Sequence, residues 1–584
     1  MKKVVFALVP LLFGLSACSQ MPTRSQGGGA APEQAPQTAP AATKAPAAAG
    51  SQAAAEDQLS PELLFRLLVA EVAGQRGQLK VSVDNYVAAA RLSRDPRIAE
   101  RATRIAVYAR DDAKALEAAR LWAELQPQDM DAQQVVAALL VRNGKTDEAL
   151  AHLERVVEAS KAQGYKGYML VTSLLSREKD KEAAMRVMGQ LVQRHQDNPD
   201  ALYAYGHLAV SVGKLDIARQ AIDKVIKLRP GWTQAYILSA SIDERRGHPE
   251  QALAQLKGAV QRYPKKDDLR LYYARQLIDA KQLDKARDQF KALLAHSPRN
   301  ADALFAMGLL ELQANRLDPA AGYFRRLIKT GQRVSEASYF MGQIEEARDK
   351  PKRAIRWYGV VREGKYYVEA QIRVAVLLAK AGQVKAAQDR LHQLEPQSAA
   401  MKHRLLLAEG EILREVKHYK QAFELYSKAL KDDPDDADLR YARALTAEKL
   451  DRLPVVESDL KYIIKREPNN AQALNALGYT LADRTKRYQE ALGYIQRALK
   501  LQPDDPAILD SMGWVQYRLG HLDRAAQYLR QAFGKMKDAE IGAHLGEVLW
   551  VSGKQAEARK VWNEALKTSP DHESLLKVIR RFTK

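Results

Sequence analysis

The side chains that could carry chemistry are scattered through this chain. Its eleven histidines include no pair at metal-binding helical spacing and no His-Glu-x-x-His motif. We identify no phosphate-cradling glycine-rich loop and no Gly-x-Ser-x-Gly elbow. Ser-x-x-Lys spacing occurs four times, as at Ser458/Lys461, but it arises by accident in a helical chain rich in both residues. We therefore expect no enzyme activity, no metal site and no cofactor.

The single cysteine lies where a lipid anchor would be attached. Lys2 and Lys3 precede an apolar run that ends in Leu15-Ser16-Ala17-Cys18, which is typical of a signal peptide over residues 1–17. The segment resembles a bacterial lipoprotein signal, and the resemblance implies cleavage before Cys18 and lipidation of its thiol. Ser19, in place of Asp, implies the outer membrane, with the body facing the periplasm. The alternative is an ordinary secretory signal with a stray cysteine.

Residues 18–57 are predicted to form a disordered tether. Pro, Ala, Gly, Gln and Thr dominate this segment, which cannot bury enough apolar surface to offset its ordering entropy. The chain after it has no apolar stretch near the ~18 residues that a membrane-spanning helix needs. The formal charge is +20, but it is spread evenly along the body, so we do not expect nucleic-acid binding.

The body, residues 58–570, is one supersecondary unit repeated. A small residue recurs at a reference position, as in Met307-Gly308, Met341-Gly342 and Met512-Gly513, and the mean spacing is 33.9 residues. Ala recurs twelve residues later, which lets two helices approach closely. The predicted reference positions of the fifteen units are 71, 105, 137, 172, 206, 240, 274, 308, 342, 375, 410, 444, 478, 513 and 546.

Helix-ending residues divide each unit into two helices. Gly or Asn, as at Gly213 and Asn315, stands seven residues after the reference position and accepts the left-handed backbone that ends a helix. Pro, as at Pro230, stands 24 residues after it and closes the second helix. One such pair cannot bury its apolar face alone, so the pairs must stack. We expect paired acids such as Asp504-Asp505 to serve the start of the following helix.

This pattern resembles the tetratricopeptide repeat, a helix-turn-helix family. The resemblance covers roughly residues 60–570 and implies an all-α, right-handed superhelical solenoid of about fifteen helix pairs, with the amino-terminal pairs degenerate. Residues 571–584 place Leu575, Leu576, Ile579 and Phe582 on one helical face and read as a capping helix.

The resemblance also implies a concave wall built from the first helix of each pair. Aromatic residues there would offer contact area for a protein partner. The alternative is that the rings complete the packing between pairs, for which Trp514 and Trp550 are the least expected because Trp rarely fits a crowded helix seam. A Lys and Asn clamp for a terminal carboxylate is not supported. The candidate wall residues are Tyr203, His207, Phe305, Tyr339, Tyr441, Tyr479, Trp514, Tyr517 and Trp550.

The first predicted helix has an unusual apolar face. A Ser60 cap and Pro61 open it, and its residues include Leu64, Phe65 and Leu68. A terminal solenoid helix normally needs a polar outer face, so an uncovered one indicates a docking surface. Alternatively, the tether or an irregular neighbour covers it.

The order of signal, tether, opening helix and repeats resembles the lipoprotein adaptors of the carboxyl-terminal processing protease. That resemblance implies an outer-membrane adaptor that recruits and activates a periplasmic serine protease and presents cell-wall hydrolases to it. The alternative is an assembly lipoprotein of an envelope machine, in polysaccharide export or pilus biogenesis. In both cases the partners are proteins and the chain acts as a scaffold.

Overall fold

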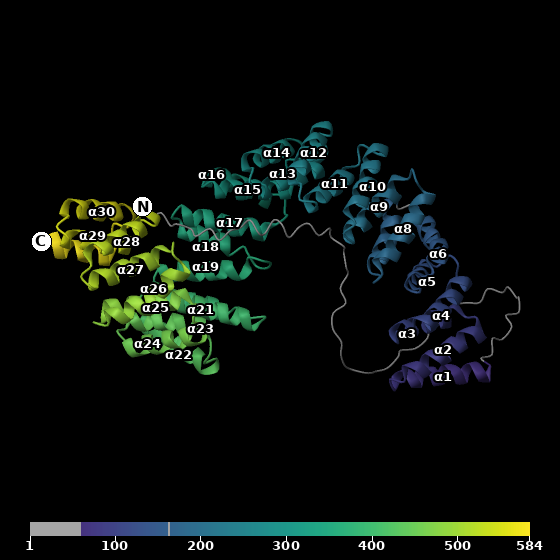
Figure 1. Cartoon of the computed structure of the whole chain (residues 1–584), viewed down its shortest axis with the longest axis horizontal. Helices are drawn as coiled ribbons and strands as arrows, with labels where there is room; N and C mark the ends of the chain where they lie inside the picture. The colour runs from purple at the N-terminus through teal and green to yellow at the C-terminus, as the bar shows by residue number, and fades with distance from the viewer. Residues whose placement is uncertain (1–59, 162–163, 584) are drawn as a thin grey trace, which may run out of the picture. The chain divides into compact units, whose positions relative to one another are not determined.

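The computed structural model describes residues 60–161 and 164–583, which form 31 α-helices and no β-strand. The predicted signal peptide, Cys18 and the whole predicted tether of residues 18–57 lie outside these residues. Figure 1 labels most of the helices, which are numbered in chain order. The chain divides into two compact units between Ala303 and Leu304, inside α15.

The odd-numbered helices are the first members of the predicted pairs. Their bounds are α1 Pro61–Gln75, α3 Pro96–Tyr108, α5 Met130–Arg142, α7 Tyr165–Ser176, α9 Pro199–Ser211, α11 Thr233–Arg245, α13 Asp267–Asp279, α15 Ala301–Gln313, α17 Val334–Ala347, α19 Tyr367–Lys380, α21 Ala399–Glu415, α23 Ala437–Lys449, α25 Ala471–Arg484, α27 Pro506–Arg518, α29 Ala539–Val551 and the unpaired last helix α31 Glu573–Thr583.

The even-numbered helices are the second members. Their bounds are α2 Leu79–Ser93, α4 Asp112–Leu125, α6 Thr146–Ala159, α8 Lys181–Arg194, α10 Leu215–Leu228, α12 Pro249–Arg262, α14 Leu283–His296, α16 Leu317–Ile328, α18 Pro351–Tyr358, α20 Val384–His392, α22 Tyr419–Asp432, α24 Leu453–Arg466, α26 Tyr488–Leu501, α28 Leu522–Lys535 and α30 Gln555–Thr568.

The predicted stop signals end the helices as expected. Gly213, Gly520 and the other glycines of this set have positive φ angles, and Asn315 adopts the same conformation at 56°. The helix-closing prolines stand just beyond the second helices, as Pro230 does after α10. Asp505 caps α27, because its carboxylate accepts hydrogen bonds from the backbone N–H groups of Ala507 and Ile508 at 2.9 and 3.0 Å.

Most pairs set a large buried side chain of the second helix opposite a small residue of the first, and where the small residue is one of seven glycines a Cβ there would lie within 3 Å of that side chain. We call the small residue on the odd-numbered helix the small position, and the buried residue sixteen positions later, on the even-numbered helix, the large position (seventeen later for Ile495). The fifteen pairings are Ala70/Tyr86, Thr103/Ala119, Ala137/Leu153, Thr172/Met188, Gly206/Ile222, Ala240/Leu256, Ala274/Phe290, Gly308/Phe324, Gly342/Tyr358, Ala375/Leu391, Gly410/Tyr426, Ala444/Leu460, Gly478/Ile495, Gly513/Leu529 and Gly546/Trp562.

The first two reference positions predicted from the sequence were misplaced. The small position is Ala70 rather than Glu71, because Ala70 is fully buried and Ser82, twelve residues later, donates its hydroxyl to the Ala70 carbonyl at 2.7 Å. Similarly, Thr103 is buried in the second pair, whereas Ile105 is only partly buried. Neither Ala70 nor Thr103 is a glycine, so the sequence of these two degenerate pairs does not mark which residue occupies the small position.

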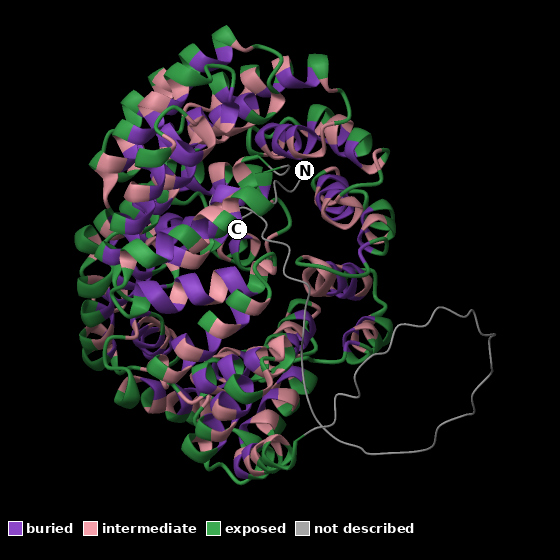
Figure 2. Ribbon diagram, turned by 90° about the vertical axis from the view of Figure 1, so that its right-hand side faces the viewer, coloured by how far each residue is buried: buried purple, intermediate pink, exposed green. Residues whose placement is uncertain are grey.

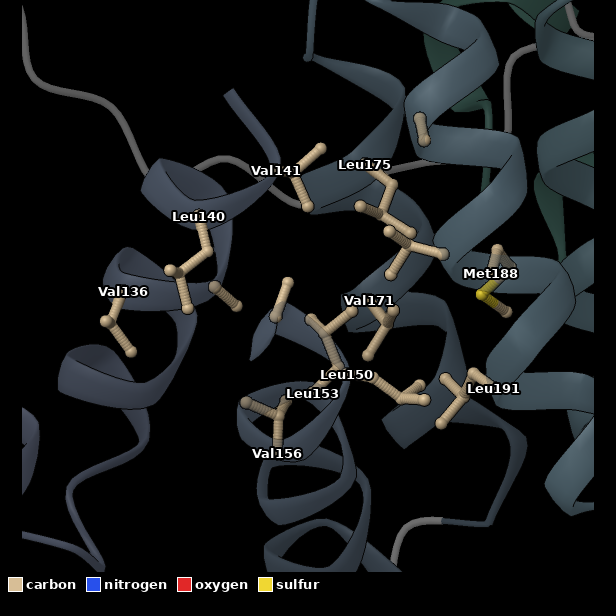
Figure 3. Packing of buried hydrophobic residues seen from close by; sticks show 14 of the residues in the cluster. Val136, Leu140, Val141, Leu150, Leu153, Val156, Val171, Leu175, Met188 and Leu191 are labelled. Carbon is tan, nitrogen blue, oxygen red and sulfur yellow. The ribbon is translucent and has the colours of Figure 1, made fainter. Parts of the chain in front are cut away.

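Buried residues run continuously from pair to pair. In the amino-terminal unit one hydrophobic cluster extends from Ala70 to Ile242. Figure 3 shows part of it, with Leu140 from α5, Leu153 from α6, Val171 from α7 and Met188 from α8 drawn together. Buried and exposed residues alternate along the helices, as Figure 2 shows. The stack of pairs, rather than any single pair, therefore provides the core.

We predict that Gly308→Ala destabilises its pair. A Cβ at Gly308 would lie 2.6 Å from the Phe324 ring, which is fully buried and stacks on Phe340 with centroids 5.4 Å apart, so it cannot move aside. We expect the free energy of unfolding to fall by about 1–3 kcal/mol, which is the usual effect of overpacking a core. Urea unfolding followed by circular dichroism measures it.

Gly322→Ala, in the second helix of the same pair, is the control. A Cβ there meets no atom within 4 Å. Its helical glycine makes the substitution stabilising by roughly 0.5–1 kcal/mol. Equal effects of the two substitutions would contradict the role assigned to the small position.

Candidate functional site

The candidate wall residues all lie on odd-numbered helices, and most are covered by neighbouring side chains. Tyr203, Phe305, Tyr339 and Trp514 are buried, whereas the remaining five are half-buried. Their positions are Tyr203 and His207 on α9, Phe305 on α15, Tyr339 on α17, Tyr441 on α23, Tyr479 on α25, Trp514 and Tyr517 on α27, and Trp550 on α29.

On α9, Tyr203 belongs to an aromatic cluster. Its ring centroid lies 4.6 Å from that of Trp232 and 6.0 Å from that of Tyr165, which come from the two neighbouring odd-numbered segments. Burial raises the pKa of Tyr203 to about 12. Burial and then the nearby Arg245 lower the pKa of His207, whose Nδ1 is buried without a hydrogen-bond partner. The neutral form of His207 is therefore favoured, and its Nδ1 is an unsatisfied polar atom within this cluster.

Phe305 and Tyr339 each pack against rings of the adjacent pairs. The Phe305 ring lies 5.7 Å from Phe340, and the Arg333 guanidinium sits 3.8 Å above it. Tyr339 stacks on Tyr366, with centroids 4.6 Å apart. These rings hold successive pairs together, which is the packing role that the sequence left open as the alternative to partner binding.

A polar and aromatic cluster joins α27 and α29. His544 Nδ1 lies 3.0 Å from the carboxylate of Asp510, and its ring stacks on Trp514 at 4.2 Å. Burial alone would lower the pKa of His544, but the charge of Asp510 and its hydrogen bond outweigh it and raise the pKa to about 9. Asp510 therefore favours the protonated form of His544, and the Trp514 ring stacks against this buried pair.

The two tryptophans do fit the seams between helices. Trp514 is 7% exposed, and Trp550 is flanked by Trp562 and Phe582 at centroid distances of 5.5 and 6.1 Å. The expectation that Trp would not fit such a seam is wrong for Trp514, which is buried. Beside the half-buried Trp550, the absence of a side chain at Gly546 makes room for Trp562. Tyr517 donates its hydroxyl to Glu547 at 3.2 Å. A binding role for these rings stays a prediction.

Sequence reasoning searched the wall for aromatic residues and missed its carboxylates. Glu244 stands on α11, four residues after the small position Ala240, so its place on the wall could have been read from the repeat. Its Oε1 is buried without a hydrogen-bond partner. Burial, then the nearby charges of Asp279 and Asp243, raise the pKa of Glu244 to about 7. Its ionised form is therefore disfavoured by burial and lacks a hydrogen-bond partner at Oε1.

We predict that Glu244→Gln stabilises the protein at pH 8 and has little effect below pH 4.5. The folded-state pKa is raised above its ordinary value of 4.5, so ionisation costs stability progressively as the pH rises from about 4.5 to about 7. Gln removes that cost. Thermal unfolding of both proteins across this range measures the difference, and a wild type at least as stable as the variant at pH 8 would refute it.

Helix α1 leaves its apolar face open. Leu64 is 45% exposed, Phe65 64% and Leu68 57%. The predicted start is correct: Ser60 Oγ accepts a hydrogen bond from the Leu63 N–H at 3.2 Å, and Pro61 is the first helical residue. No other segment that the structure describes covers these three side chains to the point of burial.

One segment has the spacing of a phosphate-binding loop, contrary to the expectation from the sequence. The segment from Gly359 to Lys365 has Gly-x-x-x-x-Gly-Lys spacing, which the sequence search overlooked. Tyr366 follows where a phosphate loop has Ser or Thr, and the segment follows α18 rather than a strand. Lys461, from the Ser-x-x-Lys set, hydrogen-bonds Glu457 at 2.8 Å, and this bond raises its pKa, the opposite of what a general base needs.

Within residues 60–161 and 164–583, one group of side chains has the donor types for a metal ion. His403, Asp436 and Asp438 bring a ligand atom each to within 4.8 Å of one another. They lie at the starts of α21 and α23, in two successive pairs, so helical His spacing could not reveal them. Asp436 also caps α23 through the Leu439 N–H, and the positive end of that helix disfavours a cation.

No helix of the described chain is both long and apolar enough to span a membrane.

Comparison with known proteins supports the repeat assignment. Family models described as tetratricopeptide repeat match residues 199–231, 245–294, 274–334, 305–367, 457–506 and 511–573. The TPR repeat-containing protein PA4667 of Pseudomonas aeruginosa is 37% identical over 490 residues, which is 84% of this chain and 82% of that protein.

Other matches are more distant. A TPR repeat-containing protein of Methanocaldococcus jannaschii is 31% identical over 112 residues, 19% of each chain. Among solved structures, yeast Tom70 covers 72% of this chain and 96% of its own at 16% identity and a TM-score of 0.38. The Cut9-Hcn1 complex covers 90% and 97% at 13% identity and a TM-score of 0.32.

Proposed function

Because this chain belongs to the tetratricopeptide-repeat family, we propose that it is a non-catalytic adaptor anchored to the outer membrane through Cys18. It faces the periplasm, recruits and activates a carboxyl-terminal processing serine protease, and presents cell-wall hydrolases to it. The repeats themselves imply a scaffold for protein–protein interaction. The anchor, the compartment and the identity of the partners are the proposed part.

The observation that carries this proposal is the open face of α1. Leu64, Phe65 and Leu68 sit at helical spacing on one side of a helix whose other side is fixed by the buried residues Ala70 and Ala73. An apolar face at the free end of a solenoid is costly in water unless a partner covers it. A groove on the protease that accepts an amphipathic helix fits this face.

In this proposal the lipid anchor attaches the protein to the membrane, and the repeats bind its protein partners. A lipidated Cys18 would hold the body at the membrane through the Pro/Ala-rich tether of residues 18–57. The array of odd-numbered helices offers further surface to a second protein. Holding a protease and its substrate on one molecule raises their effective concentration without any new chemistry.

We predict that Phe65→Glu together with Leu68→Glu abolishes protease binding while the helices remain intact. Both side chains are more than half exposed, so the charges disturb no core. The assay uses the purified processing protease and the body from residue 19 onward, and it measures both binding and the protease's peptidase rate. Leu501→Glu is the control, because Leu501 is 42% exposed on α26, far along the chain. A purified protease that is neither bound nor activated by the wild-type body would reject the proposal.

We predict that Cys18→Ser releases the protein from the membrane into the soluble periplasmic fraction. Without the thiol no acyl chains can be attached, and each buried CH₂ of such a chain contributes about 0.8 kcal/mol to membrane binding. Ser19→Asp should instead keep the protein lipidated but move it away from the outer membrane. Cell fractionation and immunoblotting measure both, and unchanged outer-membrane retention of Cys18→Ser would contradict a lipid anchor.

A further inference from the structure

A pocket of about 450 Å³ lies between α26, α27 and α28, helices that Figure 1 labels. Its volume falls within the range of small-molecule sites, roughly 300–1,000 Å³. Leu499 and Met512 supply its apolar part. Its polar lining consists of Gln496, Lys500, Gln516, Arg524, Gln527 and Tyr528.

The floor of this pocket holds an amide that lacks a good acceptor. Gln516 on α27 is only 6% exposed. Its Oε1 is hydrogen-bonded to His521 Nδ1 at 2.8 Å, so the side-chain orientation is set. Its Nε2 reaches only the sulfur of Met512, at 3.8 Å, and a thioether is a weak acceptor. A buried N–H donor without a proper partner costs free energy, which an oxygen atom of a bound molecule would recover.

Two cations stand at the rim of the same pocket. Lys500 on α26 and Arg524 on α28 make no ion pair with any Asp or Glu of residues 60–161 and 164–583, and no acidic side chain lines the pocket. The lining therefore carries two positive charges that are not compensated locally. An anionic group that enters between them would gain charge-assisted hydrogen bonds.

A second pocket, in the amino-terminal unit, also contains cationic side chains, but there each one is paired with a carboxylate. It has a volume of about 320 Å³ and lies between α2 and α4. Each of its three arginines is neutralised by a glutamate: Arg91 by Glu117, Arg94 by Glu124 and Arg120 by Glu148. Of these two pockets, the one at α26–α28 combines a net positive lining with an under-satisfied buried donor.

We propose that the pocket at α26–α28 binds a sugar-sized molecule that carries a carboxylate or phosphate group. Lys500 and Arg524 would hold the anion. The amides of Gln496, Gln516 and Gln527 can both donate to and accept from sugar hydroxyl groups, and Tyr528 adds a hydroxyl. Leu499 and Met512 offer an apolar surface for the C–H face of a sugar ring. This site does not depend on the adaptor role, because it uses neither α1 nor the lipid anchor.

The test is calorimetric titration of the full body with four probes: glucuronic acid, glucose 6-phosphate, glucose and inorganic phosphate. We expect at least one of the two anionic sugars to bind with a Kd below about 10 mM, and glucose and inorganic phosphate to bind at least about tenfold more weakly. Binding of glucuronic acid and not of the phosphate sugar assigns a carboxylate ligand, and the reverse assigns a phosphate ligand. Inorganic phosphate that binds as tightly as either sugar acid would overturn the proposal, and so would the failure of both sugars to bind.

Variants identify the residues. Arg524→Gln and Lys500→Gln should each weaken binding of the anionic sugar by about tenfold, the loss expected for one charge-assisted hydrogen bond. Arg497→Gln is the matched control, because Arg497 is exposed on the same helix α26, bonds the Pro468 carbonyl and does not line the pocket. An equal loss in Arg497→Gln would mean that general charge rather than this pocket holds the sugar. An unchanged affinity in both pocket variants would overturn the site, and circular dichroism checks that every variant is folded.

Discussion

The contact between the small and the large position is the constraint on which this solenoid depends. At every pair a buried side chain from the second helix rests where the first helix carries Gly, Ala or Thr. At Gly206 and Gly513 even a methyl group would come within 2.8 and 2.5 Å of the facing Ile222 and Leu529 side chains. The two helices can therefore approach closely only because one of them has almost no side chain at that place.

Glycine makes room for a large ring in four pairs. A Cβ at Gly308, Gly342, Gly410 or Gly546 would come within 2.6 Å of the facing ring of Phe324, Tyr358, Tyr426 or Trp562. The match is not strict, because Ala70 and Ala274 stand opposite Tyr86 and Phe290, and Gly206 and Gly513 stand opposite Ile222 and Leu529. A residue without a side chain on the first helix nevertheless lets the repeat place even a tryptophan in a seam that would otherwise exclude it.

The fold could be predicted from the sequence because its signals are local and repeated many times. Glycines such as Gly213 and prolines such as Pro230 act through the backbone, so their effect does not depend on distant neighbours. The register failed at Glu71 and Ile105, where the small residue is Ala or Thr and no longer stands out. Lys281 and Asp451 also adopt positive φ angles, 59° and 58°, just after helices. Because neither is a glycine, these two helix ends could not be predicted from the residue type.

The site was harder to predict, since its properties arise between repeats. The raised pKa of Glu244 and the contact of Asp510 with His544 depend on residues about one repeat away, and the state of the Gln516 amide depends on its burial. A single sequence indicates which residues share a helix face, but it does not indicate which of them lose water when the pairs stack. The open face of α1 was predictable because a terminal helix lacks one neighbour by definition.

The two ends of the array are finished differently. At the carboxyl end α31 buries Leu575 completely and lays Phe582 over the last aromatic pair, whereas at the amino end Phe65 and Leu68 remain in solvent. In a structure held together by nearest neighbours, fraying starts where the last neighbour is missing. The amino-terminal helices are thus expected to unfold locally more often than the other described helices. A partner that binds to them would therefore also stabilise the adjoining repeats against unfolding.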